Sequence, residues 1–309
     1  MIRNFIILLF LPFWIMAVDY CSISSDHTMC KYKGPGPACG KERISGISER
    51  EIREILKVHN DFRSIVALGK ERRGNPGPQP AAANMNALIW DNNLAEVAQR
   101  WADQCTFQHD FSRQDPRFQV GQNIYFATGY PKSNWTQAIS TWYEEVTEFN
   151  SKNVKKFQFQ FTTGHYTQLV WGNTRYIGCG KTTYNTPLRA FDYEQKEYIL
   201  SSIPRNESIR NDDYLIGDNL SSNVQHLSKI INNNNNNEKH NFEKNVLHTR
   251  VKKWIGDEWI NIYENMGKNH ILVCNYGPSG NFLYQPVYIS GKHCSQCPFG
   301  FQCINGLCI

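Results

Sequence analysis

The chain has 309 residues, enough to bury a full hydrophobic core and to carry extra segments around one large domain. Its formal net charge is +5 at pH 7, and its 33 Lys and Arg residues are scattered along the sequence. This scatter argues against a nucleic-acid-binding protein. The ten cysteines can form disulfides or bind metal, depending on the compartment in which the protein folds.

Residues 1–17 have the order of a secretory signal peptide, so we expect the mature protein to begin near Val18. Arg3 precedes an apolar run from Phe5 to Trp14. The run is shorter than the ~20 residues of a spanning helix, which argues against the alternative of an uncleaved membrane anchor. No later segment is apolar over 18 consecutive residues. We therefore expect a secreted, extracellular protein that does not span a membrane and whose cysteines form disulfides.

Residues 18–47 lack hydrophobic periodicity, and their cysteines, glycines and prolines predict an irregular arm held by disulfides. The first clear helix begins at Ser48, which can form a capping box with Glu51. His59 lies on the apolar face of this helix. A hydrogen-bonded structural histidine explains that position better than a ligand does.

Two more helices are predicted downstream. Asp91 is the expected N-cap of the second helix, and Cys105 is expected to close its last turn. The third helix begins near Asn134 or Thr136 and places Glu145 beside its apolar face. Short strands are predicted at residues 120–125, 176–184 and 271–276. Helices and strands in this order, without βαβ repetition, predict an α+β fold with helices packed on an antiparallel sheet.

Residues 185–268 break this pattern, because they are polar, weakly periodic and contain a run of asparagines from Asn232 to Asn237. Such a composition cannot bury enough apolar surface to order itself, which predicts a disordered surface insertion. An alternative interpretation is an A/T-rich intron translated in error, which would be absent from the mature message.

The C-terminal tail, residues 291–309, contains four cysteines in a short stretch. In an oxidising compartment these predict two disulfides. A zinc knuckle is disfavoured because it would need reduced thiolates.

Two motifs carry a resemblance to a known family. The first is Gly164-His-Tyr-Thr-Gln-Leu-Val-Trp171, and the second runs from His270 to Phe282 as HILVCNYGPSGNF. Both resemble signatures of the CAP superfamily, which comprises cysteine-rich secretory proteins, antigen 5 and pathogenesis-related 1 proteins. The loop Asn75-Pro-Gly-Pro78 is typical of the insect antigen 5 (venom allergen 5) branch. The resemblance implies a three-layer α-β-α sandwich over residues 48–290, interrupted by the insertion, with a small disulfide-rich C-terminal tail.

The same resemblance implies the disulfide pairing. A further pair that is typical of antigen 5 proteins is absent, because Ser25 and Ser112 occupy both of its positions. The implied pairs are Cys21–Cys30, Cys39–Cys105, Cys179–Cys274, Cys294–Cys303 and Cys297–Cys308.

CAP proteins have a central cleft with two histidines and two glutamates, which correspond here to His109, His165, Glu145 and, in place of the second glutamate, Gln122. Two imidazoles and one carboxylate form a known zinc-binding set, so His109, Glu145 and His165 are candidate ligands for zinc or another divalent cation. The amide at position 122 removes a charge and a potential base, so we expect binding to be weak. The alternative is that these side chains only hydrogen-bond to one another.

The sequence therefore favours a secreted, monomeric, non-enzymatic CAP protein that acts by binding. The resemblance implies a sterol or other lipid, a divalent metal, or a protein of another organism as the ligand. The alternative is a secreted metal-dependent hydrolase that uses the His/Glu cleft; no residues are assigned as catalytic. Asn134, Asn206 and Asn219 are predicted glycosylation acceptors, although Asn134 is also a predicted helix N-cap.

Overall fold

The computed structural model describes residues 18–128, 134–185, 252–255, 258–261 and 268–309. The chain forms two compact units, one from residues 1–186 and 269–309 and the other from residues 187–268. Residues 1–17, predicted to be a signal peptide, and the predicted glycosylation acceptors Asn206 and Asn219 lie outside the described residues.

The larger unit holds the helices that the sequence predicts, together with shorter ones. The α-helices are α1 (Tyr20–Ile23), α2 (Thr28–Lys31), α3 (Glu49–Ala67), α4 (Asn92–Ala102), α5 (Trp135–Glu144) and α6 (Gly164–Leu169). Single 3-10 turns are η1 (Pro37–Cys39), η2 (Glu145–Thr147), η3 (Ser151–Val154) and η4 (Phe161–Thr163). The strands are β1 (Arg43–Ser45), β2 (Ile89–Trp90), β3 (Gly121–Thr128), β4 (Tyr176–Asn185), β7 (Lys268–Gly277), β8 (Cys303–Ile304) and β9 (Leu307–Cys308).

The three long helices begin at the caps that the sequence predicts. Ser48 and Glu51 form a reciprocal capping box at the start of α3. Asp91 caps α4 by accepting a hydrogen bond from Leu94 N at 2.9 Å. Asn134 Oδ1 accepts from the third residue of α5 at 2.7 Å. These caps satisfy N–H groups that the helices themselves leave unpaired.

The prediction that Cys105 closes the last turn of α4 is wrong. The helix ends at Ala102, because the amides of Gln104 and Cys105 bond to the carbonyls only three residues earlier. Cys105 then takes a φ of 54°, in the left-handed region that no helix residue occupies. The chain therefore turns out of the helix before it reaches the cysteine.

The sheet has the order β1-β4-β7-β3, with β2 beside β4. The pairs β1–β4 and β3–β7 are antiparallel, and the short β2–β4 pair is parallel. Strands β3, β4 and β7 coincide with the three predicted strands to within a few residues. In the β3–β7 register Gln122 lies opposite Asn275.

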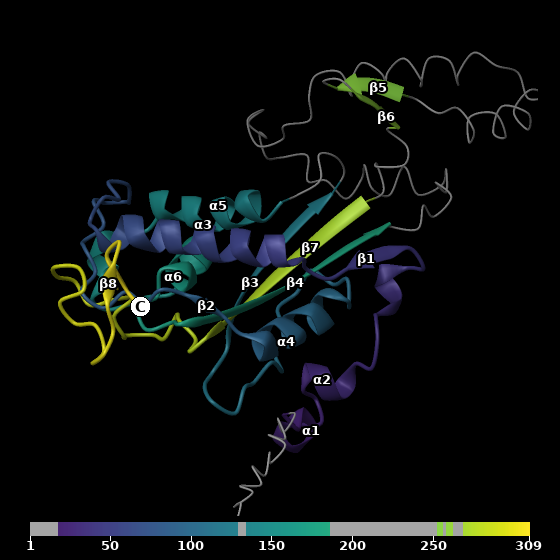
Figure 1. Ribbon diagram of the computed structural model, residues 1–309, viewed down its shortest axis with the longest axis horizontal. Coiled ribbons are helices and arrows are strands. Elements are labelled where there is room, and N and C mark those ends of the chain that lie inside the picture. The colour runs from purple at the N-terminus through teal and green to yellow at the C-terminus, as the bar shows by residue number, and fades with distance from the viewer. Residues whose placement is uncertain (1–17, 129–133, 186–251, 256–257, 262–267) are drawn as a thin grey trace, which may run out of the picture. The chain divides into compact units, whose positions relative to one another are not determined.

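Alternate residues of β7 enter two separate cores, one on each face of the sheet. Ile271 and Val273 pack in a cluster with Ala98 and Ala102 of α4. Leu272, Cys274 and Tyr276 join a larger cluster that includes residues of α3, α5 and α6. Because successive strand residues point to opposite faces, this alternation puts helices on both sides of the sheet (Figure 1). The three-layer α-β-α sandwich is confirmed.

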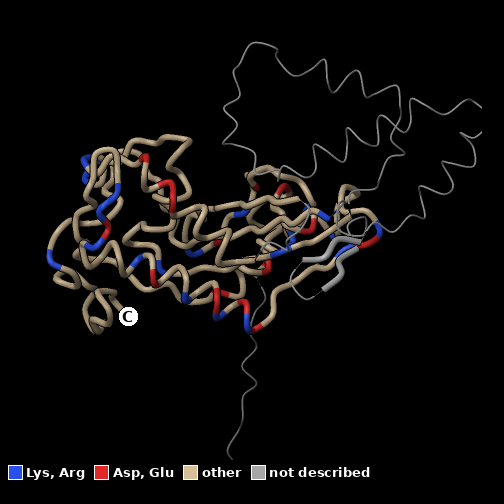
Figure 2. The backbone as a smooth tube through the Cα atoms, turned by 90° about the horizontal axis from the view of Figure 1, so that it is seen from above, with Lys and Arg blue, Asp and Glu red and all other residues tan. Residues whose placement is uncertain are grey.

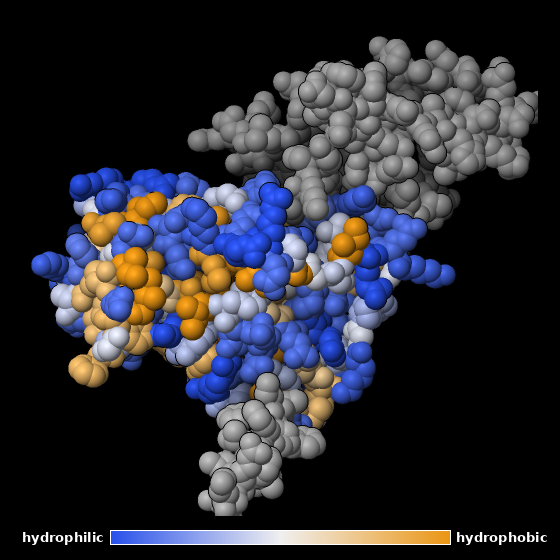
Figure 3. Space-filling view, viewed as in Figure 1, coloured by the Kyte–Doolittle hydropathy of each residue, from blue (hydrophilic) through white to orange (hydrophobic). Residues whose placement is uncertain are grey.

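The surface of the larger unit mixes charge and apolar side chains. Figure 2 shows basic and acidic positions interspersed along much of the backbone. Figure 3 shows apolar side chains gathered on the side where Figure 1 places α6, β8 and the C-terminus. In the described part of the chain no helix is long and apolar enough to cross a membrane.

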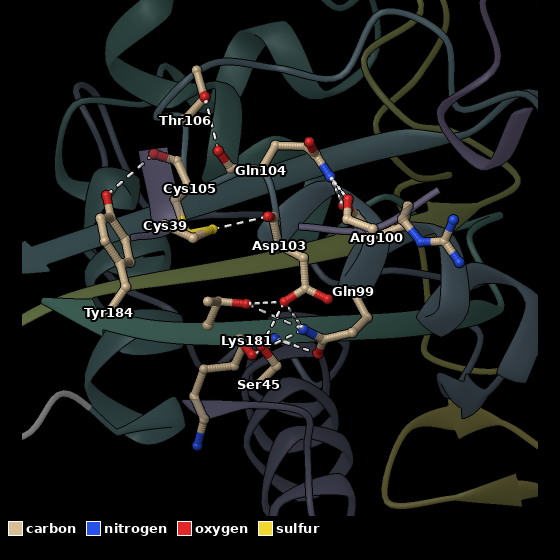
Figure 4. The surroundings of a disulfide bond; sticks show 12 residues. Cys39, Ser45, Gln99, Arg100, Asp103, Gln104, Cys105, Thr106, Lys181 and Tyr184 are labelled. Carbon is tan, nitrogen blue, oxygen red and sulfur yellow. Dashed lines mark hydrogen bonds between the residues drawn. A yellow bond between two sulfur atoms is a disulfide. The ribbon is translucent and has the colours of Figure 1, made fainter. Parts of the chain in front are cut away.

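All five disulfides implied by the resemblance are present, and no described cysteine is free. Cys39–Cys105 ties the N-terminal arm to the end of α4 (Figure 4). Beside it, Asp103 Oδ1 accepts hydrogen bonds from Ser45 Oγ at 2.6 Å and Gln99 Nε2 at 3.1 Å. The arm, predicted to be irregular, thus contributes β1 to the sheet edge and is held by covalent and polar links.

The smaller unit contains an antiparallel pair, β5 (Lys252–Ile255) and β6 (Glu258–Asn261). This pair lies within the segment for which the composition predicts disorder. The rest of that segment lies outside the described residues.

Candidate functional site

A cavity of about 380 Å³ lies where β3, the loop after α4 and the start of α6 meet. Three of the four predicted cleft residues line it: His109, Gln122 and His165. Its other lining residues are Phe111, Arg113, Gly121, Asn123, Phe159, Phe161, Gly164, Gln168, Ser279, Gly280 and Asn281.

His109 follows α4 and is oriented by Gln122. Gln122 Oε1 lies 3.0 Å from His109 Nδ1 and also accepts a hydrogen bond from Asp110 N at 2.9 Å. Because a carbonyl oxygen only accepts, His109 Nδ1 carries the proton and its Nε2 carries the lone pair. Gln122 Nε2 in turn donates to Asn275 Oδ1 at 3.0 Å, across the β3–β7 register. Gln122 therefore fills a position that needs both a donor and an acceptor.

His165 lies in the first turn of α6 and is oriented by Glu145, at the C-terminal end of α5. Its Nδ1 is 2.6 Å from Glu145 Oε1, a short contact typical of a hydrogen bond to a charged acceptor. Glu145 Oε2 accepts from the backbone amides of His165 at 2.9 Å and Tyr166 at 3.0 Å. The carboxylate thus makes three hydrogen bonds and lies behind the imidazole, outside the lining of the cavity.

The environment of His109 keeps its ring neutral. Burial lowers its pKa below the usual value, and the charges of Arg113 and His165 act in the same direction. The hydrogen bond to Gln122 opposes this shift only partly. A neutral imidazole with its Nδ1 proton fixed is the form in which histidine binds a metal through Nε2.

A second, closed cluster lies behind the cavity. His59 is fully buried, and its two ring nitrogens contact Ile55 O at 2.8 Å and Tyr276 Oη at 2.9 Å. Burial lowers the pKa of His59 to about 4. The prediction that His59 is a structural histidine is confirmed, because both of its nitrogens are used inside the core.

Trp142 lies between the two clusters. Its ring centroid is 6.3 Å from that of His59 and 6.2 Å from that of His165, on which it stacks. Asn123 joins the clusters too, since its Nδ2 donates to His165 O at 3.0 Å and lies 3.4 Å from Tyr276 Oη. Asn123 and Asn275 escaped the sequence prediction. Asn123 follows Gln122 on a predicted strand and Asn275 lies inside the second motif, but neither position indicates which side chain the amide contacts.

The metal-ligand set predicted from the sequence is only partly assembled. His109 and His165 share the cavity, whereas both oxygens of Glu145 are engaged by hydrogen bonds. Within the described residues no group of three or more His, Cys, Asp and Glu side chains is placed to hold a metal ion. The arrangement offers two imidazole nitrogens as ligands and a glutamate that orients one of them.

Comparison with solved structures supports the fold. The crystal structure of Na-ASP-1 aligns with a TM-score of 0.52 and 22% identity, over 89% of this chain and 50% of that chain. NaASP2, solved with Zn²⁺, aligns with a TM-score of 0.51 and 24% identity, over 85% of this chain and 97% of that chain.

Comparison with curated sequences is more specific. The sequence model described as the cysteine-rich secretory protein (CAP) family matches residues 56–190. Venom allergen 5.01 of Dolichovespula maculata is 46% identical over 279 residues, which cover 87% of this chain and 88% of that protein. A venom allergen 3 homolog of Dinoponera quadriceps is 49% identical over 182 residues, or 55% of this chain and 79% of that protein. The chain therefore belongs to the cysteine-rich secretory protein (CAP) family, among relatives named venom allergen 5 and 3.

Proposed function

We propose that this chain is a secreted, non-enzymatic CAP protein that acts by binding, and that its cavity holds a divalent cation on His109 and His165. One observation carries the metal site: both imidazoles line one cavity and have Nδ1 hydrogen-bonded to a side-chain acceptor. This leaves Nε2 of each ring as the available ligand atom. A bound cation would supply Lewis acidity and would link the loop after α4, which carries His109, to the start of α6, which carries His165.

Binding at this site is expected to be weak and exchangeable. Zinc in stable protein sites takes three or four protein ligands. Here two imidazoles are available, and Glu145 and Gln122 act by orienting them. Water would complete the coordination.

The hydrolase alternative has less support. A general base needs a carboxylate or imidazole free to take a proton. Glu145 already accepts three hydrogen bonds, and Gln122 is an amide that cannot titrate. In the proposed site the free nitrogens of His109 and His165 would hold the cation and could not also take a proton. We therefore assign no catalytic residue.

The metal proposal is tested by calorimetric titration of Zn²⁺ and Cu²⁺ into the full chain. Wild-type protein is expected to bind in the micromolar range, and the double variant His109→Ala/His165→Ala to lose binding. His293→Ala, in the C-terminal tail, is the matched histidine control and should bind as wild type does. Binding that survives the double variant in folded protein would show that the cavity histidines are not the ligands.

Secretion is supported by the five disulfides, since such bonds persist in oxidising compartments. Mass spectrometry of the protein from the medium of expressing insect cells is expected to give an N-terminus near Val18. Retention of Met1 or of the protein inside the cells would contradict secretion. A sterol, another lipid, or a protein of another organism remains the predicted ligand beyond the metal.

A further inference from the structure

Two neighbouring loops expose a row of large apolar side chains. In the segment Phe157–Phe161 every second residue is phenylalanine, and Phe159 and Phe161 are 47% and 90% exposed. In the other loop Leu283 and Tyr284 are 55% and 67% exposed. Single exposed apolar residues are ordinary, but a contiguous group of them marks an interaction surface.

The backbone holds the two loops side by side. Tyr284 N donates to Phe157 O at 2.9 Å, Phe157 N donates to Gln285 O at 2.9 Å, and Val287 N donates to Val154 O at 2.8 Å. These bonds make the exposed residues of both loops parts of one surface.

Buried aromatic rings anchor the exposed ones. Phe161 contacts Phe159 at 5.2 Å between centroids, and Phe159 contacts the buried Phe157 at 6.5 Å. Phe157 contacts the buried Trp171 at 5.5 Å, which in turn contacts Phe282 at 6.4 Å. The exposed rings therefore project from a packed aromatic row and lose little conformational freedom on binding.

Three lysines precede Phe157 in the same segment and lack acidic partners among the described residues. Lys152, Lys155 and Lys156 are exposed, and Lys156 Nζ lies 5.4 Å from the centroid of the Tyr284 ring. No ion pair involves any of the three lysines within the described residues. Residues 149–185 and 268–309 contain no aspartate or glutamate. The two segments that build the surface thus carry positive charge only.

We propose that this aromatic–lysine surface docks the protein on anionic lipid membranes. Aromatic rings partition into the interface between water and lipid, and lysines near it are attracted to anionic headgroups. The uncompensated lysines favour an anionic membrane over a neutral one. This surface acts independently of a cation in the cavity, although Phe159 and Phe161 also border the cavity.

The proposal is tested by sedimenting the full chain with vesicles of phosphatidylcholine alone or with roughly one-third phosphatidylserine. Wild-type protein is expected to sediment with the mixed vesicles and not with the neutral ones. Lys155→Ala/Lys156→Ala should lower the partition coefficient about 25-fold, because each lysine is expected to contribute a factor of about five. Phe161→Ser, at an almost fully exposed position, should weaken it roughly tenfold.

Matched controls come from other elements of the fold. Ile44→Ser on β1 removes a side chain that is 69% exposed, and Lys57→Ala on α3 removes a lysine paired with Asp61. Both controls are expected to bind mixed vesicles as wild type does. Absence of wild-type binding, equal binding to neutral vesicles, or equal losses in the control variants would overturn the proposal. If the protein binds neither kind of vesicle, the surface would be expected to bind a protein instead.

Discussion

Two histidine clusters contact the ring of Trp142 from different sides, and they differ in whether a ring nitrogen remains free to bind a ligand. On one side His59 uses both nitrogens inside the core. On the other side His165 uses Nδ1 for Glu145 and lines a cavity with His109. A histidine whose two ring nitrogens are both hydrogen-bonded in the core is structural. A histidine whose second ring nitrogen is free at a cavity is a candidate ligand.

The closed cluster continues to Arg63, one turn along α3 from His59. Arg63 is fully buried, and among the described residues it donates to backbone carbonyls and has no carboxylate partner. Its acceptors are the carbonyls of Asn86, Leu169, Trp171, Gly172 and Thr174. One guanidinium therefore satisfies the carbonyls of Asn86, Leu169 and Thr174, which would otherwise be unpaired in the core.

The largest expected effect is the loss of this guanidinium. Arg63→Met keeps the length of the side chain but leaves the buried carbonyls of Asn86, Leu169 and Thr174 without their donor, so the free energy of unfolding should fall by at least about 4 kcal/mol. Urea unfolding measures this change. Arg53→Met, at an exposed position of the same helix, should change it by less than about 0.5 kcal/mol. Equal effects in both variants would show that the cluster is not a structural centre.

The next effect is a pH dependence of the closed cluster. Because the pKa of His59 is lowered to about 4 in the folded state, the unfolded chain binds a proton there below pH ~6.5 and the folded chain does not. The free energy of unfolding should therefore fall as pH drops from ~6.5 to ~4, by about 3 kcal/mol in total.

This pH window is separate from that of the paired carboxylates Glu51 and Glu71, whose pKa values are lowered to about 2. Urea unfolding at a series of pH values measures the slope. His59→Gln should be less stable at pH 7 and should show a smaller slope. An unchanged slope in His59→Gln would mean that this histidine is not the group responsible.

In the open cluster, Glu145→Gln tests the orienting role of the carboxylate. The amide keeps one acceptor oxygen but turns an NH₂ donor toward the N–H groups of His165 and Tyr166. We therefore expect the free energy of unfolding to fall by about 1–2 kcal/mol. If the cavity binds Zn²⁺, affinity should also fall by about tenfold or more. Glu148→Gln, on an exposed site nearby, is the control and should change neither quantity.

The smallest expected effect on stability comes from Gln122→Glu, a loss of about 1 kcal/mol in the free energy of unfolding, because only the bond donated to Asn275 Oδ1 is lost. The oxygen that accepts from His109 Nδ1 and Asp110 N is kept. The added negative charge should raise the pKa of His109, because an opposite charge beside the ring favours its protonated form. An NMR titration of the imidazole signals measures this pKa. Gln137→Glu, at an exposed position of α5, should leave it unchanged. A pKa of His109 that does not rise would show that residue 122 does not contact the ring in solution.

Local signals in the sequence predicted most of the sandwich. Capping residues located the starts of α3, α4 and α5, because a cap is a local hydrogen bond. The parallel β2–β4 pair and the pairing of β1 were not predictable, since they depend on partners far along the chain. The β5–β6 pair has a local signal in the sequence. The dipeptide Gly256-Asp257, which favours a hairpin turn, lies between two short runs that each contain a tryptophan.

For the site, the motifs located His109, Gln122, Glu145 and His165 but not their roles. Whether Glu145 is a ligand or an orienting group depends on which of its oxygens are already bonded, which only the packing of α5 against α6 decides. The sequence likewise predicts only that Gln122 lacks a charge. Its role as a donor to Asn275 depends on the pairing of β3 with β7, which the sequence does not specify.

The Cys179–Cys274 bond joins β4 to β7, which lie on either side of residues 186–267 in the sequence. The other four disulfides each lie wholly before or wholly after those residues. A protease that cuts anywhere between residues 186 and 267 would therefore yield a two-chain protein held by this single covalent link. Such a product would migrate as one species on a gel until a reductant is added.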